Sequence, residues 1–287
     1  MEVRSPVTVA GTASDSHRSS LGRAVTLPTP TTARPTLATM PRTRILVLAG
    51  TTEARLLAER LHDTGHEVIV SLAGRTSSTR HLAGEIRSGG FGGAPGLARF
   101  IADRAVTTVV CATHPFAARM PFNATDACAI TGTPLIRLLR PAWHPVDGDR
   151  WVTVADLDRA ADALITLGSR HVLLTTGRQE LRPFAALGDI SFTVRCIEPP
   201  DVTGFARADV VLDRGPFTVQ AERALLAERS IDAVVSKNSG GAATAAKLVA
   251  AREARVPVVM VERPMAPAVH TVERNDDVIE WIVRQHA

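Results

Sequence analysis

Short apolar runs alternate with amphipathic stretches along most of the chain, from Arg44 onward. The runs are rich in Val, Ile and Leu, as buried strands are, and the stretches between them carry apolar residues at helical spacing. Strands that alternate with helices are typical of a parallel sheet with crossover helices. The pattern therefore predicts an α/β protein.

The first half of this pattern predicts one doubly wound domain, in residues 42–142. We expect its strands at residues 45–49, 67–72, 107–112 and 135–139, and its helices at 53–64, 95–105 and 116–131.

The pattern restarts after residues 140–149, a segment with two prolines and a glycine that is a good candidate for a domain boundary. Residues 143–287 are therefore predicted to form a second domain of the same kind. We expect its strands at residues 151–154, 171–175, 191–197, 209–212, 233–236 and 258–261, and its helices at 156–167, 219–229, 242–254 and 277–285.

Residues 1–41 are rich in Ser, Thr, Pro, Arg and Ala and show no apolar periodicity, so we expect a disordered N-terminal extension. They lack the apolar core of a signal peptide. Met40 stands directly before the first predicted strand, and the simplest interpretation is that translation starts there. A targeting or regulatory tail is the alternative.

Composition excludes several classes of protein. The formal net charge of +4 is spread thinly, unlike the basic stripe of a nucleic-acid-binding protein. The three cysteines show no metal-ligand spacing, so neither a disulfide nor a metal site is expected. The apolar runs are far shorter than the roughly 20 residues that span a bilayer. We therefore expect a cytoplasmic protein without a membrane partner.

The chain contains only two lysines, Lys237 and Lys247, among 33 basic residues. Because nearly all basic positions in this chain are Arg, a Lys suggests a specific role at its position. Lys237 lies in a glycine-rich loop and is expected to have a specific role. Lys247 lies in a helical stretch and is expected to be an ordinary surface residue.

Ligands of doubly wound sheets bind at the carboxyl ends of strands, so motifs there carry the most weight. Gly50 follows the first strand and opens a helix whose first amides can bind a phosphate. It lacks the full G-x-G-x-x-G spacing, so a plain tight turn is equally compatible. Residues 71–75 end on Arg75, which can pair with the 2′-phosphate of NADP where an acidic residue would favour NAD; an ordinary surface Arg is the alternative.

Two further motifs of the first half have the same placement. Residues 89–93 read Gly-Gly-Phe-Gly-Gly, and such strings lie where backbone takes positive φ or approaches a ligand, although a flexible loop is the alternative. His114 follows a strand within Ala-Thr-His-Pro-Phe-Ala, where it could bind cofactor or donate a proton, although a structural role is more common.

Three loops of the second half also follow strands and combine cations with glycine. They are Thr175-Thr-Gly-Arg178, Asp213-Arg-Gly-Pro216 and Lys237-Asn-Ser-Gly-Gly241. Arg binds carboxylates through two parallel hydrogen bonds, and helix starts bind anions. Together these loops predict a pocket for a molecule with several carboxylates.

Taken in order, these motifs resemble those of the precorrin-6A reductase family, over about residues 44–265. The resemblance implies two Rossmann-like doubly wound parallel-sheet domains with a cleft between them. It also implies a cytoplasmic enzyme that uses NADPH to reduce a ring carbon–carbon double bond of precorrin-6A, giving precorrin-6B in cobalamin (vitamin B12) biosynthesis. The expected partner is this tetrapyrrole, and the expected state is a monomer or weak homo-oligomer.

By the same resemblance, the first-half loops hold the cofactor and the second-half loops hold the macrocycle. Catalytic candidates are Lys237 and His114; the proton donor stays open between these two and bound water. Expected cofactor-binding residues are Gly50, Thr51, Thr52, Glu53, Arg55, Leu72, Ala73, Gly74, Arg75, Gly90, Phe91, Gly92, Gly93, Thr113, His114 and Pro115. Expected substrate-binding residues are Thr176, Gly177, Arg178, Arg214, Gly215, Lys237, Asn238, Ser239, Gly240 and Gly241.

The chain departs from the family pattern at three positions. Ala49 and Ala54 stand where Gly is common, a small change, whereas Cys111 stands where Asp is frequent. If that Asp served proton delivery or cofactor placement, this chain must do so otherwise.

Three alternative functions are compared with this assignment. A reductase of the cobalt-loaded analogue would carry the same motifs. An NADPH-sensing regulator would bind cofactor without turnover, and it leaves the cationic second-half loops unexplained. A short-chain dehydrogenase or epimerase would need a Tyr-x-x-x-Lys pair, and the chain contains no Tyr.

Overall fold

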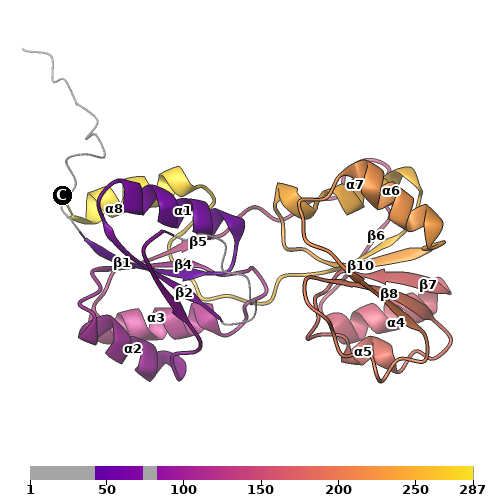
Figure 1. Ribbon diagram of the computed structural model, residues 1–287, viewed down its shortest axis with the longest axis horizontal. Coiled ribbons are helices and arrows are strands. Elements are labelled where there is room, and N and C mark those ends of the chain that lie inside the picture. Colours follow the sequence, from indigo (N-terminus) through magenta and orange to yellow (C-terminus); the bar gives the residue numbers. More distant parts are fainter. Residues whose placement is uncertain (1–42, 74–82, 287) are drawn as a thin grey trace, which may run out of the picture. The chain divides into compact units, whose positions relative to one another are not determined.

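The protein folds into two six-stranded parallel sheets, each with helices on both faces (Figure 1). This computed structural model describes residues 43–73 and 83–286. The predictions for residues 1–41, and for Gly74 and Arg75, fall outside the described residues. Two parallel-sheet α/β domains are as the alternation of apolar runs predicted; the cleft between them stays a prediction.

The first sheet consists of β1 (Arg44–Ala49), β2 (Glu67–Leu72), β3 (Glu85–Ser88), β4 (Thr108–Ala112), β5 (Leu135–Leu138) and β12 (Thr271–Val272). Its strand order is β12-β5-β4-β1-β2-β3. One face is covered by α1 (Thr52–Asp63) and α8 (Asn275–His286), and the other by α2 (Gly93–Asp103) and α3 (Met120–Thr131) (Figure 1). Because both faces are covered, the central strands read as continuous apolar runs.

The second sheet consists of β6 (Trp151–Val154), β7 (His171–Leu174), β8 (Ser191–Cys196), β9 (Ala208–Leu212), β10 (Ala233–Lys237) and β11 (Val258–Val261). Its strand order is β6-β11-β10-β7-β8-β9. Helices α4 (Leu157–Leu167) and α5 (Arg182–Ala185) lie on one face, and α6 (Val219–Glu228) and α7 (Ala246–Glu253) on the other (Figure 1).

Several elements differ from their predictions for local reasons. Strand β3 was not predicted, because it is a short, largely exposed edge strand without an apolar pattern. Helix α3 begins at Met120, four residues later than expected, because Ala117 closes a turn back onto the carbonyl of His114. The helix expected at 242–254 divides into a 3-10 turn at Ala242–Thr244 and α7.

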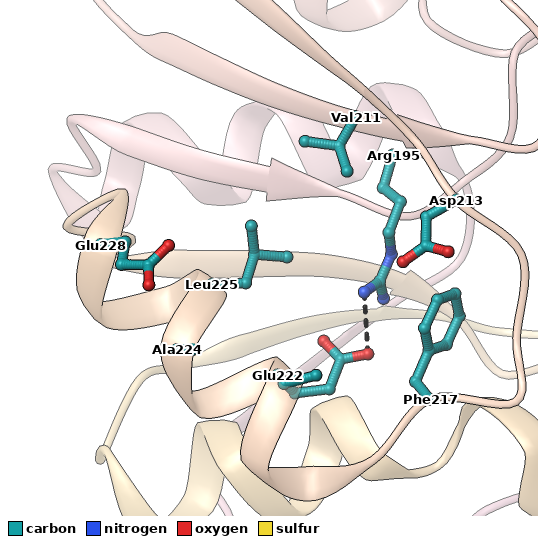
Figure 2. Close-up of a pocket in the computed structure, with 9 residues that line it drawn as sticks. Arg195, Val211, Asp213, Phe217, Glu222, Ala224, Leu225 and Glu228 are labelled. Carbon is teal, nitrogen blue, oxygen red and sulfur yellow. Dashed lines mark hydrogen bonds and ion pairs between the residues drawn. The ribbon is translucent and has the colours of Figure 1, made fainter.

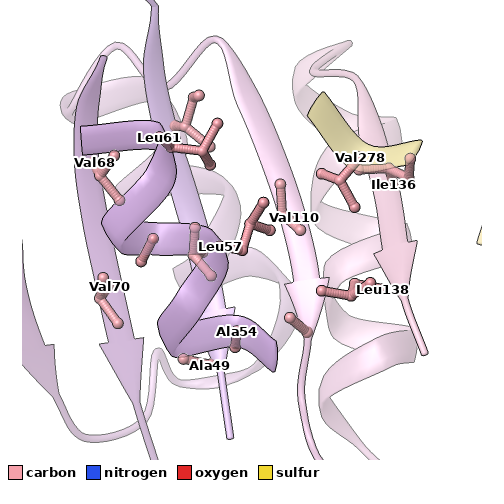
Figure 3. Packing of buried hydrophobic residues seen from close by; sticks show 14 of the residues in the cluster. Ala49, Ala54, Leu57, Leu61, Val68, Val70, Val110, Ile136, Leu138 and Val278 are labelled. Carbon is pink, nitrogen blue, oxygen red and sulfur yellow. The ribbon is translucent and has the colours of Figure 1, made fainter. Parts of the chain in front are cut away.

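The C-terminal segment belongs to the first sheet, so the prediction that all of residues 143–287 form the second domain is wrong there. Strand β12 pairs with β5, and α8 places Val278, Ile279 and Ile282 in the same buried cluster as Leu57 and Leu61 of α1. Figure 3 shows Val278 of α8 near Ile136 of β5. An apolar stripe on α8 meets sheet surface that α1 leaves uncovered. No local pattern indicates which of two similar sheets such a helix will cover.

We expect Ile282→Ala to lower the free energy of unfolding by about 2–4 kcal/mol, because a fully buried side chain is lost and a cavity remains. Ile130→Ala is the matched control, since Ile130 is 66% exposed and should cost little. Urea unfolding of both variants measures the difference. Equal effects would contradict the placement of α8 in the core.

Candidate active site at the carboxyl ends of the strands

The loops after β1 and β4 meet where the first sheet reverses its strand order. Strand β1 pairs with β2 on one side and with β4 on the other. A Cβ added to Gly50 would lie 3.0 Å from the backbone nitrogen of His114. This edge is the topological switch point, where doubly wound sheets bind their ligands. Gly50 is thus the residue that lets the two loops approach this closely.

The start of α1 offers free amide donors beside Gly50. Thr51 caps the helix, and its hydroxyl accepts a hydrogen bond from the amide of Ala54 at 3.1 Å. The amides of Thr52 and Glu53 have no acceptor within the helix, and they lie at the positive end of its dipole. These residues fit a phosphate-bearing cofactor, because a Gly without Cβ and free amides occur together at the switch point.

Two side chains predicted to contact the cofactor are engaged in ion pairs. Arg55 binds Glu59 one turn along α1, with a nitrogen–oxygen distance of 2.6 Å. Glu53 binds Arg140 at 3.3 Å, and Arg140 follows β5. Pairing with Arg140 offsets the negative charge that Glu53 brings to an anion site.

His114 is neutral at neutral pH. Its pKa is lowered to about 4, first by burial and then by the positive charges of Arg140, Lys237 and Arg263. Nδ1 accepts a hydrogen bond from the amide of Phe116 at 3.2 Å, so the ring proton lies on Nε2. His114 can therefore donate a hydrogen bond, but it holds no extra proton to deliver.

We expect His114→Gln to leave the pH dependence of kcat unchanged between about pH 5 and 8, because a group with a pKa near 4 does not titrate there. Steady-state rates across that range test this. Wild-type activity that falls as pH rises through about 6.5, with the fall abolished in the variant, would instead show that His114 is the acid.

The remaining first-half candidates lie on neighbouring loops. Leu72 is partly buried against the core, and Ala73 beside it is exposed. Thr113 lies next to Gly50, with its hydroxyl 3.8 Å from the sulfur of Cys111. Pro115 is buried. The four glycines of residues 89–93 connect β3 to α2.

The second sheet reverses its strand order between β7 and β10, and two of the predicted substrate loops follow these strands. The hydroxyl of Thr176 is buried and has no hydrogen-bond partner among the described residues. Gly177 beside it has a φ of 94°. The ammonium of Lys237 pairs with Glu180 and lies 5.1 Å from the ring centroid of Phe116.

Residues 238–241 bind the segment that follows β5. Asn238 accepts a hydrogen bond from the amide of Trp143 at 2.8 Å and donates one to its carbonyl at 3.0 Å. The carbonyl of Ser239 accepts from Arg140 at 2.7 Å, and that of Gly241 accepts from the Trp143 indole at 3.1 Å. A Cβ on Gly240 would overlap the carbonyl of Pro141. These bonds give the motif a structural role that the sequence prediction did not include.

The third predicted substrate loop borders a cavity of about 280 Å³ between β8, β9 and α6 (Figure 2). Asp213 accepts a hydrogen bond from the amide of Arg214, and Gly215 lies against the carbonyl of Ala243. Arg178, from the loop after β7, pairs with Glu198 at 3.0 Å. The cavity is lined by Arg195, Val211, Asp213, Phe217, Ala221, Glu222, Ala224, Leu225 and Glu228.

The family model described as "Precorrin-6x reductase CbiJ/CobK" matches residues 44–283. The chain belongs to this family. It is therefore an oxidoreductase, and a reductase of this kind implies a nicotinamide cofactor.

Individual relatives agree with this assignment. The chain is 48% identical over 242 residues to a precorrin-6A reductase of Rhodococcus erythropolis, covering 84% of this chain and 97% of the relative. It is 28% identical to a cobalt-precorrin-6A reductase of Priestia megaterium, covering 84% and 98%. The solved structure titled "CobK precorrin-6A reductase" superimposes with a TM-score of 0.81 at 42% identity, covering 85% of this chain and 98% of that one.

In this family member Cys111 is a neutral, buried thiol. It is 2% exposed, and burial raises its pKa. Its sulfur lies 3.8 Å from the hydroxyl oxygen of Thr113. A carboxylate at this position would bring a charge to the loop after β4, and the thiol brings none.

Lys247 of the reductase is buried, so its expected place on the surface is wrong. It is 4% exposed, its ammonium donates to the carbonyl of Thr244 at 2.8 Å, and it lies 4.7 Å from the ring centroid of Trp143. Burial lowers its pKa to about 7, while the negative charge of Glu222 opposes that shift. Glu222 also binds Arg195 at 2.8 Å, and both side chains are nearly fully buried.

Arg140 and Arg263 lie in the candidate site, and the sequence motifs did not point to them. Arg263 donates to the carbonyls of Asn238 and Arg140 at 2.9 and 3.0 Å, and both Arg residues contribute to the low pKa of His114. Each follows a strand, β5 or β11, so the rule that found the other loops applies here as well. A lone Arg after a strand simply carries no glycine signature.

Two further observations concern the described parts of the chain. Residues 43–73 and 83–286 contain no group of three or more His, Cys, Asp or Glu side chains placed to hold a metal ion. None of the helices in those ranges is both long enough and apolar enough to cross a membrane.

Proposed function

We propose that this reductase uses NADPH to reduce a ring carbon–carbon double bond of precorrin-6A, giving precorrin-6B in cobalamin biosynthesis, in the cytoplasm. The main support is the pair of switch points. One presents free amides and Gly50 beside a neutral His114. The other presents Lys237 and the buried hydroxyl of Thr176, at the ends of the paired strands β10 and β7. The first suits a dinucleotide, and the second suits a polycarboxylate.

Metal-free precorrin-6A is the proposed substrate rather than its cobalt complex. The chain is 48% identical to a relative named for the metal-free compound and 28% identical to one named for the cobalt compound. No metal-ligand cluster occurs among the described residues, but the metal of the analogue would belong to the macrocycle. The difference in identity is therefore the observation that favours the metal-free substrate.

The loops after β1, β2, β3 and β4 would hold the cofactor, and the bound nicotinamide supplies the hydride. The protein's own contribution is to orient two ligands and to exclude water. The amides at the start of α1 would bind phosphate, and Arg75 would read the 2′-phosphate. The neutral ring of His114 would donate a hydrogen bond through Nε2.

Lys237 would chiefly bind or polarise the substrate. Its ammonium is largely buried and pairs with Glu180, whose side chain is about half exposed. A substrate carboxylate or carbonyl would share that ammonium at low solvent exposure, where charge interactions are strong. Because His114 is neutral at working pH, the Lys237 ammonium and bound water are the two remaining proton donors.

An anaerobic incubation with precorrin-6A and either NADPH or NADH tests the function. We expect the product to gain two hydrogens, with NADPH strongly preferred. Arg75→Ala should remove that preference, since the Arg is proposed to pair with the 2′-phosphate. Turnover only with the cobalt-loaded substrate would move the assignment to the cobalt enzyme. Tight cofactor binding without turnover of either substrate would favour a sensor.

Lys237→Ala is expected to raise KM for the tetrapyrrole at least about tenfold, because a largely buried charged contact is lost. Glu180→Gln is the matched control: it removes the partner but keeps the ammonium, so substrate should bind at least as well. Steady-state kinetics of both variants measure this. Normal turnover and affinity in Lys237→Ala would rule out the role.

A further inference from the structure

The side chain of Arg87 binds the backbone of the glycine-rich loop at residues 89–93. Arg87 lies on β3, directly opposite Ser71 of β2. Its guanidinium donates to the carbonyl of Gly89 at 2.6 Å, to that of Gly90 at 2.6 Å, and to the Ser71 hydroxyl at 3.3 Å. A planar group with several fixed donors can bind two successive carbonyls at once, which Lys cannot do in the same way.

Two aromatic rings fix the guanidinium in place. It lies 3.7 Å from the ring centroid of Phe91 and 5.3 Å from that of Phe100, and these rings pack edge to face. Phe91 belongs to the loop and Phe100 to α2. The stack therefore connects β3, the loop and the following helix through Arg87.

The direction of the carbonyls determines where the amides point. In a trans peptide the C=O and N–H groups point in opposite directions. The carbonyls of Gly89 and Gly90 face Arg87, so the amides of Gly90 and Phe91 face away from it. Neither amide donates to a backbone carbonyl among residues 43–73 and 83–286.

Ordering this loop costs conformational entropy, which the contacts of Arg87 offset. Gly89, Gly92 and Gly93 have φ values of 104°, 80° and 84°, a region that favours glycine. A glycine-rich segment loses more conformational entropy on ordering than other segments do. Gly92 is the N-cap residue of α2 and provides no side-chain cap, so further free amides follow directly.

We propose that Arg87 is a positioning residue for cofactor binding, which turns two carbonyls inward and presents the amides of Gly90 and Phe91 to a phosphate group. This proposal rests on the proposed function, because the phosphate group in question belongs to the nicotinamide cofactor. Successive outward amides form a concave anion site. Arg87 itself is engaged with carbonyls and rings, so it acts through the loop.

Two variants separate this role from a simple charge effect. Arg87→Met keeps an apolar chain against the rings but loses the donors, and Arg87→Lys keeps the charge but loses the planar fork. We expect both to weaken NADPH binding by roughly tenfold or more, as the loss of ordered hydrogen bonds to an anion implies. At saturating NADPH, kcat and the KM for tetrapyrrole should stay within about twofold of the wild type, since loop positioning acts before chemistry.

Arg104→Met is the matched control. Arg104 also lies over Phe100, at 5.6 Å, and pairs with Glu85 of β3, but it does not contact the loop carbonyls. Its NADPH affinity should equal that of the wild type. Thermal unfolding of each variant shows whether a loss of NADPH affinity comes from the loop alone, with the overall stability unchanged.

Parallel titrations with NADPH and NADH identify the phosphate. Loss for NADPH alone places the 2′-phosphate at the amides, and equal loss for both cofactors places the pyrophosphate there; either result supports the proposal. Wild-type affinity in Arg87→Met, or in Arg87→Lys alone, would overturn it. Wild-type protein that binds neither cofactor would overturn the proposed function as well, so the two failures are distinguishable.

Discussion

Glu222→Gln is expected to lower the free energy of unfolding by about 3–5 kcal/mol, because it leaves a buried cation without its counter-charge. Glu222 is 1% exposed and binds Arg195, whose guanidinium also lies 4.0 Å from the ring centroid of Phe217. Lys247 is a second buried cation that Glu222 stabilises. Urea unfolding at neutral pH measures the loss.

Glu228→Gln is the control, since Glu228 lies on the same helix and lines the same cavity but is exposed (Figure 2). It should change stability little. A loss in Glu222→Gln no larger than in the control would show that the buried pair contributes nothing.

The loss should depend on pH through Lys247. Its pKa of about 7 in the folded protein lies below the value of 10.5 for an unperturbed Lys, so its burial penalty is full below pH 7 and relieved as pH rises from 7 to 10.5. Removing Glu222 lowers this pKa further. The variant should therefore lose more stability, relative to the wild type, at pH 6 than at pH 9.

Gly96→Ala is expected to cost about 2–4 kcal/mol of stability and to weaken cofactor binding at the same time. Gly96 is buried in the first turn of α2, and a Cβ there would overlap the backbone carbonyl of Phe91. Backbone cannot move aside as the end of a flexible side chain can. The loop at residues 89–93 must therefore shift, which disturbs the amides proposed to bind phosphate.

Gly188→Ala provides the comparison, because a Cβ at Gly188 meets no atom within 4 Å and its φ is ordinary. Thermal unfolding and an NADPH titration of both variants test the prediction. Wild-type affinity in Gly96→Ala, together with unchanged stability, would mean that the close contact with Phe91 is absent.

Local patterns were sufficient for most of the fold, and they also led to the proposed location of the site. Continuous apolar runs predicted the long central strands, because a strand covered on both faces must be apolar throughout. The carboxyl ends of those strands then indicated the loops at Gly50, His114, Thr176 and Lys237, because ligand binding at that edge follows from the parallel sheet itself. Family membership was visible in the order of the same motifs.

The sequence did not predict the contacts of individual side chains in the candidate site. Asn238 binds Trp143, almost a hundred residues earlier in the chain, and Lys247 is buried beside Glu222 and Arg195 from two other elements. Spacing along the chain does not encode such partners. The neutrality of His114 likewise depends on burial and on three cations from separate segments.

The sequence by itself determined the α/β class and the central strands, and with them the edge at which ligands are proposed to bind, because hydrophobic periodicity and chain direction are local properties. Tertiary structure alone decided that α8 returns to cover the first sheet, that Arg87 holds the glycine loop, and that a single carboxylate stabilises two buried cations. Each of these depends on which distant surfaces bury one another. The hydrophobic effect is non-directional and stabilises the burial of any apolar face that fits. The order of residues along the chain therefore does not specify which surfaces pack together.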